Sequence, residues 1–121
     1  MVVQALHSGD SSQSGLYCTP GGTMLELRRL VNQLKPRLGA ITQPTLLIHP
    51  RDDDRASMSN STFLMRKLGG LVEAVVLDDC YHIITVDRQR ELVVEHTNGF
   101  VGRVAARQAV AQTRQKRVAA A

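Results

Sequence analysis

The fold of this chain is decided by the stretch Pro44-Thr45-Leu46-Leu47-Ile48-His49-Pro50-Arg51-Asp52-Asp53-Asp54, in which a continuous apolar run ends in a cluster of carboxylates. The run over 44–49 does not alternate polar with apolar residues, which is typical of a strand covered on both faces in a parallel sheet. We therefore predict a central parallel strand here. The aspartates lie in the loop that leaves its carboxyl end.

A second strand is predicted at Val72-Glu73-Ala74-Val75-Val76-Leu77, which is rich in β-branched residues. Between the two strands, residues 57–68 carry apolar side chains at helical spacing and stop at Gly69-Gly70, residues suited to a left-handed helix cap. The order strand, helix, strand makes a βαβ crossover, whose strands must be parallel. The sequence therefore predicts an α/β fold with a partial parallel sheet.

A helix is predicted before this unit. Thr23-Met24-Leu25-Glu26 matches the capping box, in which the hydroxyl and the carboxylate satisfy each other's backbone amides at a helix start. Apolar residues then recur at spacings of three and four, and Pro36 should end the helix near Lys35. The stretch before it, residues 7–22, is rich in Ser and Gly and is predicted to be a loop.

A final helix is predicted after the second strand. Asp87 is a good N-cap residue, and apolar residues follow it at helical spacing as far as Val101, with a continuation to Val104. The two-strand unit is therefore flanked by helices, in a βαβα order.

The composition of the 121 residues, 43% of them hydrophobic, suits one ordinary domain. The longest apolar runs fall far short of the roughly 20 residues needed to cross a bilayer. The first ten residues have no basic segment followed by an apolar core, so they do not read as a secretory signal, and a cytoplasmic location is expected.

The net charge of +4 comes from the C-terminal end, because residues 103–121 hold five basic groups and no acidic ones. We interpret this segment as a basic helical or disordered tail. A nucleic-acid-binding protein would place its positive charge on a folded face, so a nucleic-acid partner is not expected.

Two parallel strands are too few for an independent sheet, because such sheets need several strands with helices on both faces. The prediction is therefore that the chain is the C-terminal part of a larger α/β domain. The alternative is a non-catalytic interaction module, whose exposed sheet edge pairs with another chain or with a second copy.

The chemistry is expected where the parallel strands end, because the loops leaving their carboxyl ends face one crevice. One loop carries Asp52 to Asp54 and the other carries Asp78-Asp79-Cys80-Tyr81-His82. A carboxylate bonded to one imidazole nitrogen fixes the tautomer and leaves the other nitrogen free to take a proton. Spacing alone leaves open either an acid–base pair or a solvated acidic loop beside a structural histidine.

No metal site or cofactor is predicted, because the four histidines lack metal-ligand spacing. Cys18 and Cys80 lie in unlike contexts and are expected to be reduced thiols rather than a disulfide. Cys80 is two residues from His82 on one loop, and a buried inert thiol is the favoured interpretation.

Residues 41–101 resemble the C-terminal segment of the α/β-hydrolase superfamily, in particular bacterial carboxylesterases and monoacylglycerol-lipase-like serine hydrolases. That family has a strand, a Gly-x-x-Asp turn bearing the triad acid, a helix, a strand, a loop bearing the triad histidine, and a final helix. The resemblance implies that Asp53 is the acid and His82 the histidine. Pro50 stands where the family usually has Gly, and Tyr81 stands where Gly is common before the histidine.

The same resemblance divides the chain into a flexible loop or lid remnant at 1–22, the C-terminal part of the hydrolase domain at 23–102, and the tail. It implies a small ester or acylglycerol-like substrate.

The nucleophile motif Gly-x-Ser-x-Gly does not occur in this sequence. Since the family's order is Ser, then Asp, then His, a C-terminal half would keep the acid and the base and be inactive alone. Epoxide hydrolases and haloalkane dehalogenases of the same fold use an aspartate nucleophile with a similar acid and histidine. The nucleophile's identity therefore stays open, and only the closer overall likeness favours ester hydrolysis.

Overall fold

The structure, a computed structural model, describes residues 20–119. Its elements are, in chain order, α1 (Gly21–Leu34), the 3₁₀ helix η2 (Lys35–Ala40), β1 (Thr45–Pro50), α2 (Met58–Lys67), β2 (Val72–Leu77) and α3 (Arg90–Ala119). Most of the predicted N-terminal loop, and Cys18 with it, lies outside the described residues.

The predicted parallel pair is confirmed: β1 and β2 run side by side in register, from Thr45 opposite Val72 to Pro50 opposite Leu77. The sheet of the described residues has these two strands alone. Within residues 20–119, β1 therefore has a neighbouring strand on one side only, which differs from the predicted central strand. Its first five residues are half-buried rather than buried.

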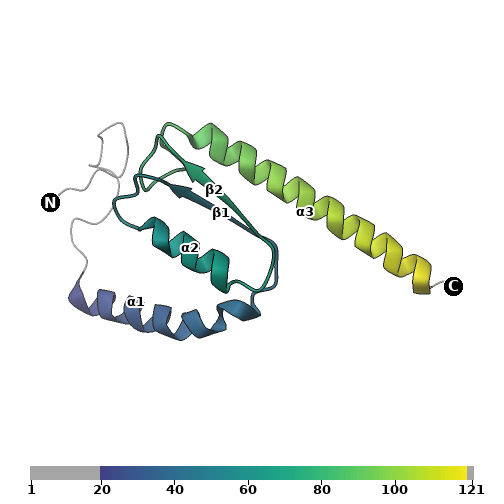
Figure 1. Ribbon diagram of the computed structural model, residues 1–121, viewed down its shortest axis with the longest axis horizontal. Coiled ribbons are helices and arrows are strands. Elements are labelled where there is room, and N and C mark those ends of the chain that lie inside the picture. The colour runs from purple at the N-terminus through teal and green to yellow at the C-terminus, as the bar shows by residue number, and fades with distance from the viewer. Residues whose placement is uncertain (1–19, 120–121) are drawn as a thin grey trace.

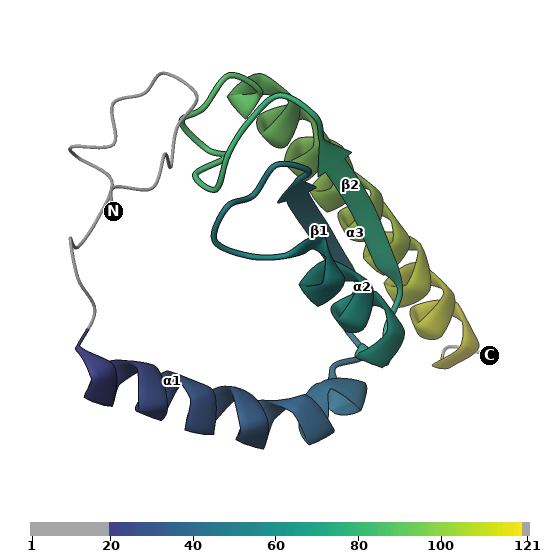
Figure 2. The same cartoon turned by 60° about the vertical axis from the view of Figure 1, so that its left-hand side comes forward.

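The elements form layers around this pair of strands. In Figures 1 and 2, α2 lies on one face of the sheet, α3 lies on the other, and α1 lies outermost on the α2 side. This is the arrangement that a βαβα order produces in an α/β fold. It brings both loops at the carboxyl ends of β1 and β2 to one end of the molecule.

The first helix begins earlier than expected and without the predicted capping box. It starts at Gly21 after Pro20, and no side-chain hydrogen bond caps it. Glu26, the expected capping carboxylate, instead accepts a hydrogen bond from Arg29 one turn later. The helix ends at Leu34 as Pro36 requires, and the chain continues as the short η2. No residue of α1 is buried.

The end of α2 differs from the prediction in its mechanism. Ser57 caps the start by accepting a hydrogen bond from the Ser59 amide, but Leu68 at the other end is extended, with φ −66° and ψ 137°. The predicted left-handed cap at Gly69-Gly70 is therefore wrong. Glycine is needed there for a close approach, because a Cβ on Gly70 would lie 2.5 Å from the Thr42 carbonyl oxygen.

The last helix begins at Arg90 rather than directly after Asp87, because the Asp87 carboxylate bonds within the preceding loop. It then runs without a break to Ala119, so that residues 103–119 are helical.

The apolar core of the described residues is small. Its buried apolar side chains are Leu77, 2% exposed, Cys80, 1% exposed, and Pro50 at the end of β1. Leu77 and Cys80 lie where β2 passes into the His82 loop, so the most tightly packed part of the chain supports the predicted site. None of the described helices is long and apolar enough to cross a membrane.

Candidate functional site

Asp53 lies in the turn that follows β1, and its side chain is only 4% exposed. Its Oδ1 accepts hydrogen bonds from the backbone amides of Arg55 and Ala56, each at 2.8 Å. An aspartate that binds its own backbone two and three residues ahead closes a tight turn. The acidic loop therefore folds around Asp53, while its neighbours Asp52 and Asp54 are exposed.

The structure brings His82 to this carboxylate across 29 residues of sequence. His82 Nδ1 lies 3.1 Å from both Oδ1 and Oδ2 of Asp53. Because a carboxylate can only accept, Nδ1 carries the proton and donates it. In the neutral ring Nε2 is then left with a lone pair. The His82 side chain is 46% exposed, so the ring sits at the surface with its Asp53 side covered.

Asp53 is held as a carboxylate by its surroundings. Burial acts to raise its pKa, but the hydrogen bonds from His82, Ala56 and Arg55 and the charge interaction with His82 outweigh burial, and the pKa is lowered. Hydrogen bonding to the charged form of an acid has this effect. The pair therefore has the properties of a base and its orienting acid: a buried, ionised carboxylate and a ring with one free nitrogen.

A second histidine lies behind the acid. His49, at the end of β1, places Nε2 2.9 Å from the Ala56 carbonyl oxygen and 3.8 Å from Asp53 Oδ2. Its Nδ1 lies 2.8 Å from the hydroxyl of Ser61, a buried residue of α2. In the sequence His49 is the last residue of the predicted first strand, and nothing there assigned it to the site. Its position four residues before Asp53 was the only indication in the sequence. That spacing does not predict a contact, because the contact depends on how the turn after β1 folds.

The His82 loop is held by a buried carboxylate that sequence reasoning assigned to a helix cap. Asp87, 5% exposed, accepts the Tyr81 amide at 2.8 Å through Oδ2 and the Arg88 amide at 2.8 Å through Oδ1. The bond to Tyr81 fixes the backbone directly before His82.

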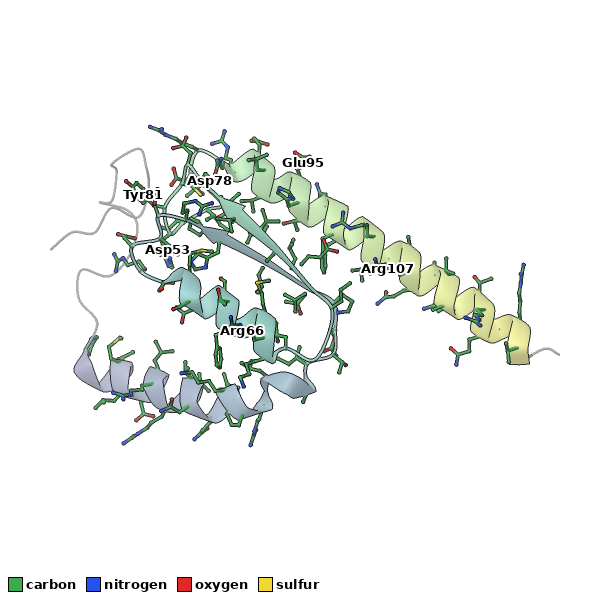
Figure 3. The ribbon with its side chains drawn as sticks, viewed as in Figure 1. Asp53, Arg66, Asp78, Tyr81, Glu95 and Arg107 are labelled. Atoms are coloured by element: carbon green, nitrogen blue, oxygen red, sulfur yellow. The ribbon has the colours of Figure 1, made fainter. Side chains whose placement is uncertain are left out.

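The two loops are also joined by an ion pair between Arg51 and Asp78, with Nε and Oδ1 2.6 Å apart. Both side chains are largely exposed, so this pair contributes little free energy. Figure 3 shows Asp53, Asp78 and Tyr81 gathered at this end of the sheet.

Cys80 does not offer a nucleophile. It is 1% exposed, and burial together with the carboxylates of Asp87, Asp79 and Asp53 raises its pKa to about 11. A thiol that stays protonated at neutral pH is a poor nucleophile.

No group of three or more metal-ligating side chains occurs among residues 20–119.

The Ser61 hydroxyl, like the Cys80 thiol, is unsuited to nucleophilic attack, because the residue is 8% exposed and its hydroxyl is bonded to His49. What the described residues bring together is thus an ionised acid and an oriented histidine. Within residues 20–119, the hydrogen bonds of the His82 ring run from Nδ1 to Asp53, and none joins Nε2 to a hydroxyl or thiol.

The sequence is 26% identical over 96 residues, 78% of this chain, to a thermostable monoacylglycerol lipase of Bacillus sp. (strain H-257). The matched region is 38% of the length of that lipase, so the chain spans well under half of this curated relative. No protein-family profile matches the chain, and no solved structure does. The chain is thus distantly similar to this lipase, and its parallel α/β unit is consistent with part of an α/β-hydrolase.

Proposed function

We propose that this chain supplies the acid and the histidine of an α/β-hydrolase that cleaves carboxylic esters, with Asp53 orienting His82 and His82 acting as general base. Residues 23–102 would then be the C-terminal part of the hydrolase domain, followed by the basic helical segment. The observation that carries the proposal is the hydrogen bond from His82 Nδ1 to the buried Asp53 carboxylate, at the carboxyl end of two parallel strands.

The mechanism follows from that geometry. Asp53 holds the ring in the tautomer whose Nε2 can accept a proton from an attacking hydroxyl, and it stabilises the positive charge that the ring then gains. When the tetrahedral intermediate collapses, the same ring donates that proton to the departing oxygen, which leaves as the alcohol. The nucleophile and the oxyanion-binding amides would come from residues outside this sequence, so the chain by itself should not hydrolyse esters.

The distant lipase relative supports an ester as the substrate class, and a small acylglycerol-like ester is our expectation. The acid and the histidine do not distinguish a serine from an aspartate nucleophile. Translating the DNA upstream of Met1 is the direct check. A Gly-x-Ser-x-Gly motif between a strand and a helix would support ester hydrolysis, and an aspartate at that position would redirect the proposal to epoxide or haloalkane hydrolysis.

Activity is tested in a chimera in which residues 41–102 of this chain replace the corresponding segment of the monoacylglycerol lipase. We expect the chimera to hydrolyse a p-nitrophenyl ester, and Asp53→Asn and His82→Ala each to remove most of that turnover. Asp52→Asn and Asp54→Asn, at the exposed neighbouring positions, are the matched controls and should retain it. Equal losses from all three aspartate variants in folded chimeras would contradict the assignment.

A second function, an interaction module that pairs through its sheet edge, is favoured by a different observation. Within residues 20–119 each strand has a neighbour on one side only, and large apolar side chains are exposed along α1. An uncovered strand edge is a template for another chain. Sedimentation of the isolated chain at dilute concentration decides: a cooperatively folding monomer would exclude obligatory pairing between copies.

A further inference from the structure

The His49 ring lies within a chain of hydrogen bonds that ends at the Asp53 carboxylate. Its Nε2 lies 2.9 Å from the Ala56 carbonyl oxygen, and the Ala56 amide in turn donates to Asp53 Oδ1 at 2.8 Å. On the other side of the ring, the Ser61 hydroxyl lies 2.8 Å from Nδ1. Strand β1, the acidic turn and helix α2 are thus joined through one side chain.

The direction of these bonds follows from the groups themselves. A carbonyl oxygen can only accept, so His49 Nε2 carries a proton and donates it to Ala56. In the neutral ring Nδ1 then accepts, which makes the Ser61 hydroxyl the donor. Both ring nitrogens are therefore occupied, which excludes His49 as a proton acceptor for a substrate.

The acidic turn depends on these hydrogen bonds because it has little apolar packing. Of residues 51–57, five are exposed, and only Asp53 and Ala56 are not. Its conformation therefore depends on hydrogen bonds, among them the two that Ala56 makes: its amide to Asp53 and its carbonyl to His49.

We propose that His49, held in place by Ser61, is a positioning residue that fixes the Asp53 carboxylate in the orientation in which it bonds His82. The importance of this role for catalysis rests on the proposed function. The role itself is a property of the folded chain and can be measured without a substrate.

The experiment compares four variants of the full chain. His49→Leu removes both ring bonds, whereas His49→Gln keeps an amide donor for the Ala56 carbonyl. Ser61→Ala removes the bond that holds the ring. Ser59→Ala is the matched control, because this exposed serine of the same helix bonds only to Ser57.

Two NMR readouts report the orientation of the acid, and urea unfolding reports stability separately. The first readout is the pKa of Asp53, measured by titrating its carboxyl group. The second is which ring nitrogen of neutral His82 carries the proton. In His49→Leu we expect the Asp53 pKa to rise towards its ordinary value of 3.8 and the Nδ1-protonated form of His82 to lose its dominance. His49→Gln should restore both, Ser61→Ala should change both in the same direction by less, and Ser59→Ala should change neither.

A folded His49→Leu chain that is less stable but keeps both readouts would overturn the proposal, because His49 would then be structural only. If His49→Leu does not fold, Ser61→Ala decides in the same way: unchanged readouts refute the positioning role. These outcomes are separate from the ester assay. If the chimera were inactive but His49→Leu changed both NMR readouts in the full chain as expected, the proposed function would be refuted. The positioning role of His49 would still be supported.

Discussion

Replacing Asp53 with asparagine should reverse the tautomer of His82 without moving the two loops. The reason is that only one of the two carboxylate oxygens of Asp53 accepts hydrogen bonds from backbone amides. Oδ1 is held by the amides of Arg55 and Ala56 at 2.8 Å, and these donors require that an oxygen remain there. The amide nitrogen of the new asparagine must therefore take the place of Oδ2, which, like Oδ1, lies 3.1 Å from His82 Nδ1.

An amide nitrogen is a donor, and both lone pairs of the remaining asparagine oxygen would be taken by the Arg55 and Ala56 amides. His82 Nδ1 would then have to accept, and the ring proton would move to Nε2. The nitrogen needed as the base would then be blocked. In serine hydrolases the corresponding change lowers turnover about 10⁴-fold through the wrong tautomer. At about 1.36 kcal/mol per tenfold change, this is roughly 5.4 kcal/mol of transition-state stabilisation.

The assay is a long-range proton–nitrogen NMR correlation on the chain, recorded at a pH where the ring is neutral. It identifies which nitrogen carries the proton, because protonated and unprotonated imidazole nitrogens resonate far apart. We expect Nδ1 to be protonated in the wild-type chain and in Asp52→Asn, and Nε2 in Asp53→Asn. Retention of the Nδ1 proton in a folded Asp53→Asn chain would refute this account of the acid's role. In the lipase chimera the same variant should lose about 10⁴-fold in kcat.

Three further predictions concern stability and reactivity. Because the folded-state pKa of Asp53 is lowered, its ionised form contributes stability above the unfolded-state value of 3.8, and this is lost as the pH falls through the folded-state value. In urea titrations at decreasing pH, from about pH 5 to pH 2, the wild-type free energy of unfolding should therefore fall more steeply than that of Asp53→Asn; parallel slopes would contradict the hydrogen-bond network. Gly70→Ala should destabilise the chain by about 1–3 kcal/mol, because its Cβ would lie 2.5 Å from the Thr42 carbonyl oxygen. Gly22→Ala, in helix α1 with nothing within 4 Å of its Cβ, should instead stabilise by about 0.5–1 kcal/mol, and equal effects in urea unfolding would refute the close approach. With its pKa raised to about 11, the Cys80 thiol should react slowly with iodoacetamide at pH 8 in a Cys18→Ser background and rapidly in urea; fast labelling of the native chain would show that the thiol is not buried.

The sequence by itself determined which segments form strands and which form helices between them. An uninterrupted apolar run at residues 44–49, followed by a helix and a second apolar strand, predicts a parallel pair of strands. The structure contains this pair, with the two strands in register. Because parallel strands share their carboxyl ends, the order of the elements predicted that the acidic loop and the His82 loop would meet, whereas the choice of Asp53 and His82 as the pair came from the resemblance to the α/β-hydrolases. Helix boundaries were less predictable, since the capping box at Thr23 competed with an earlier start at Gly21 that makes no side-chain bond.

Only the tertiary structure decided what surrounds the acid. Asp53 rather than Asp52 or Asp54 faces inward because its Oδ1 closes the turn onto the Arg55 and Ala56 amides, a backbone conformation that three consecutive aspartates leave open. The contact of His49 with Ser61 joins two elements whose approach depends on how α2 packs on β1. Side-chain hydrogen bonds between distant segments depend on positions set to within an ångström, whereas hydrophobic periodicity specifies only the element and its buried face.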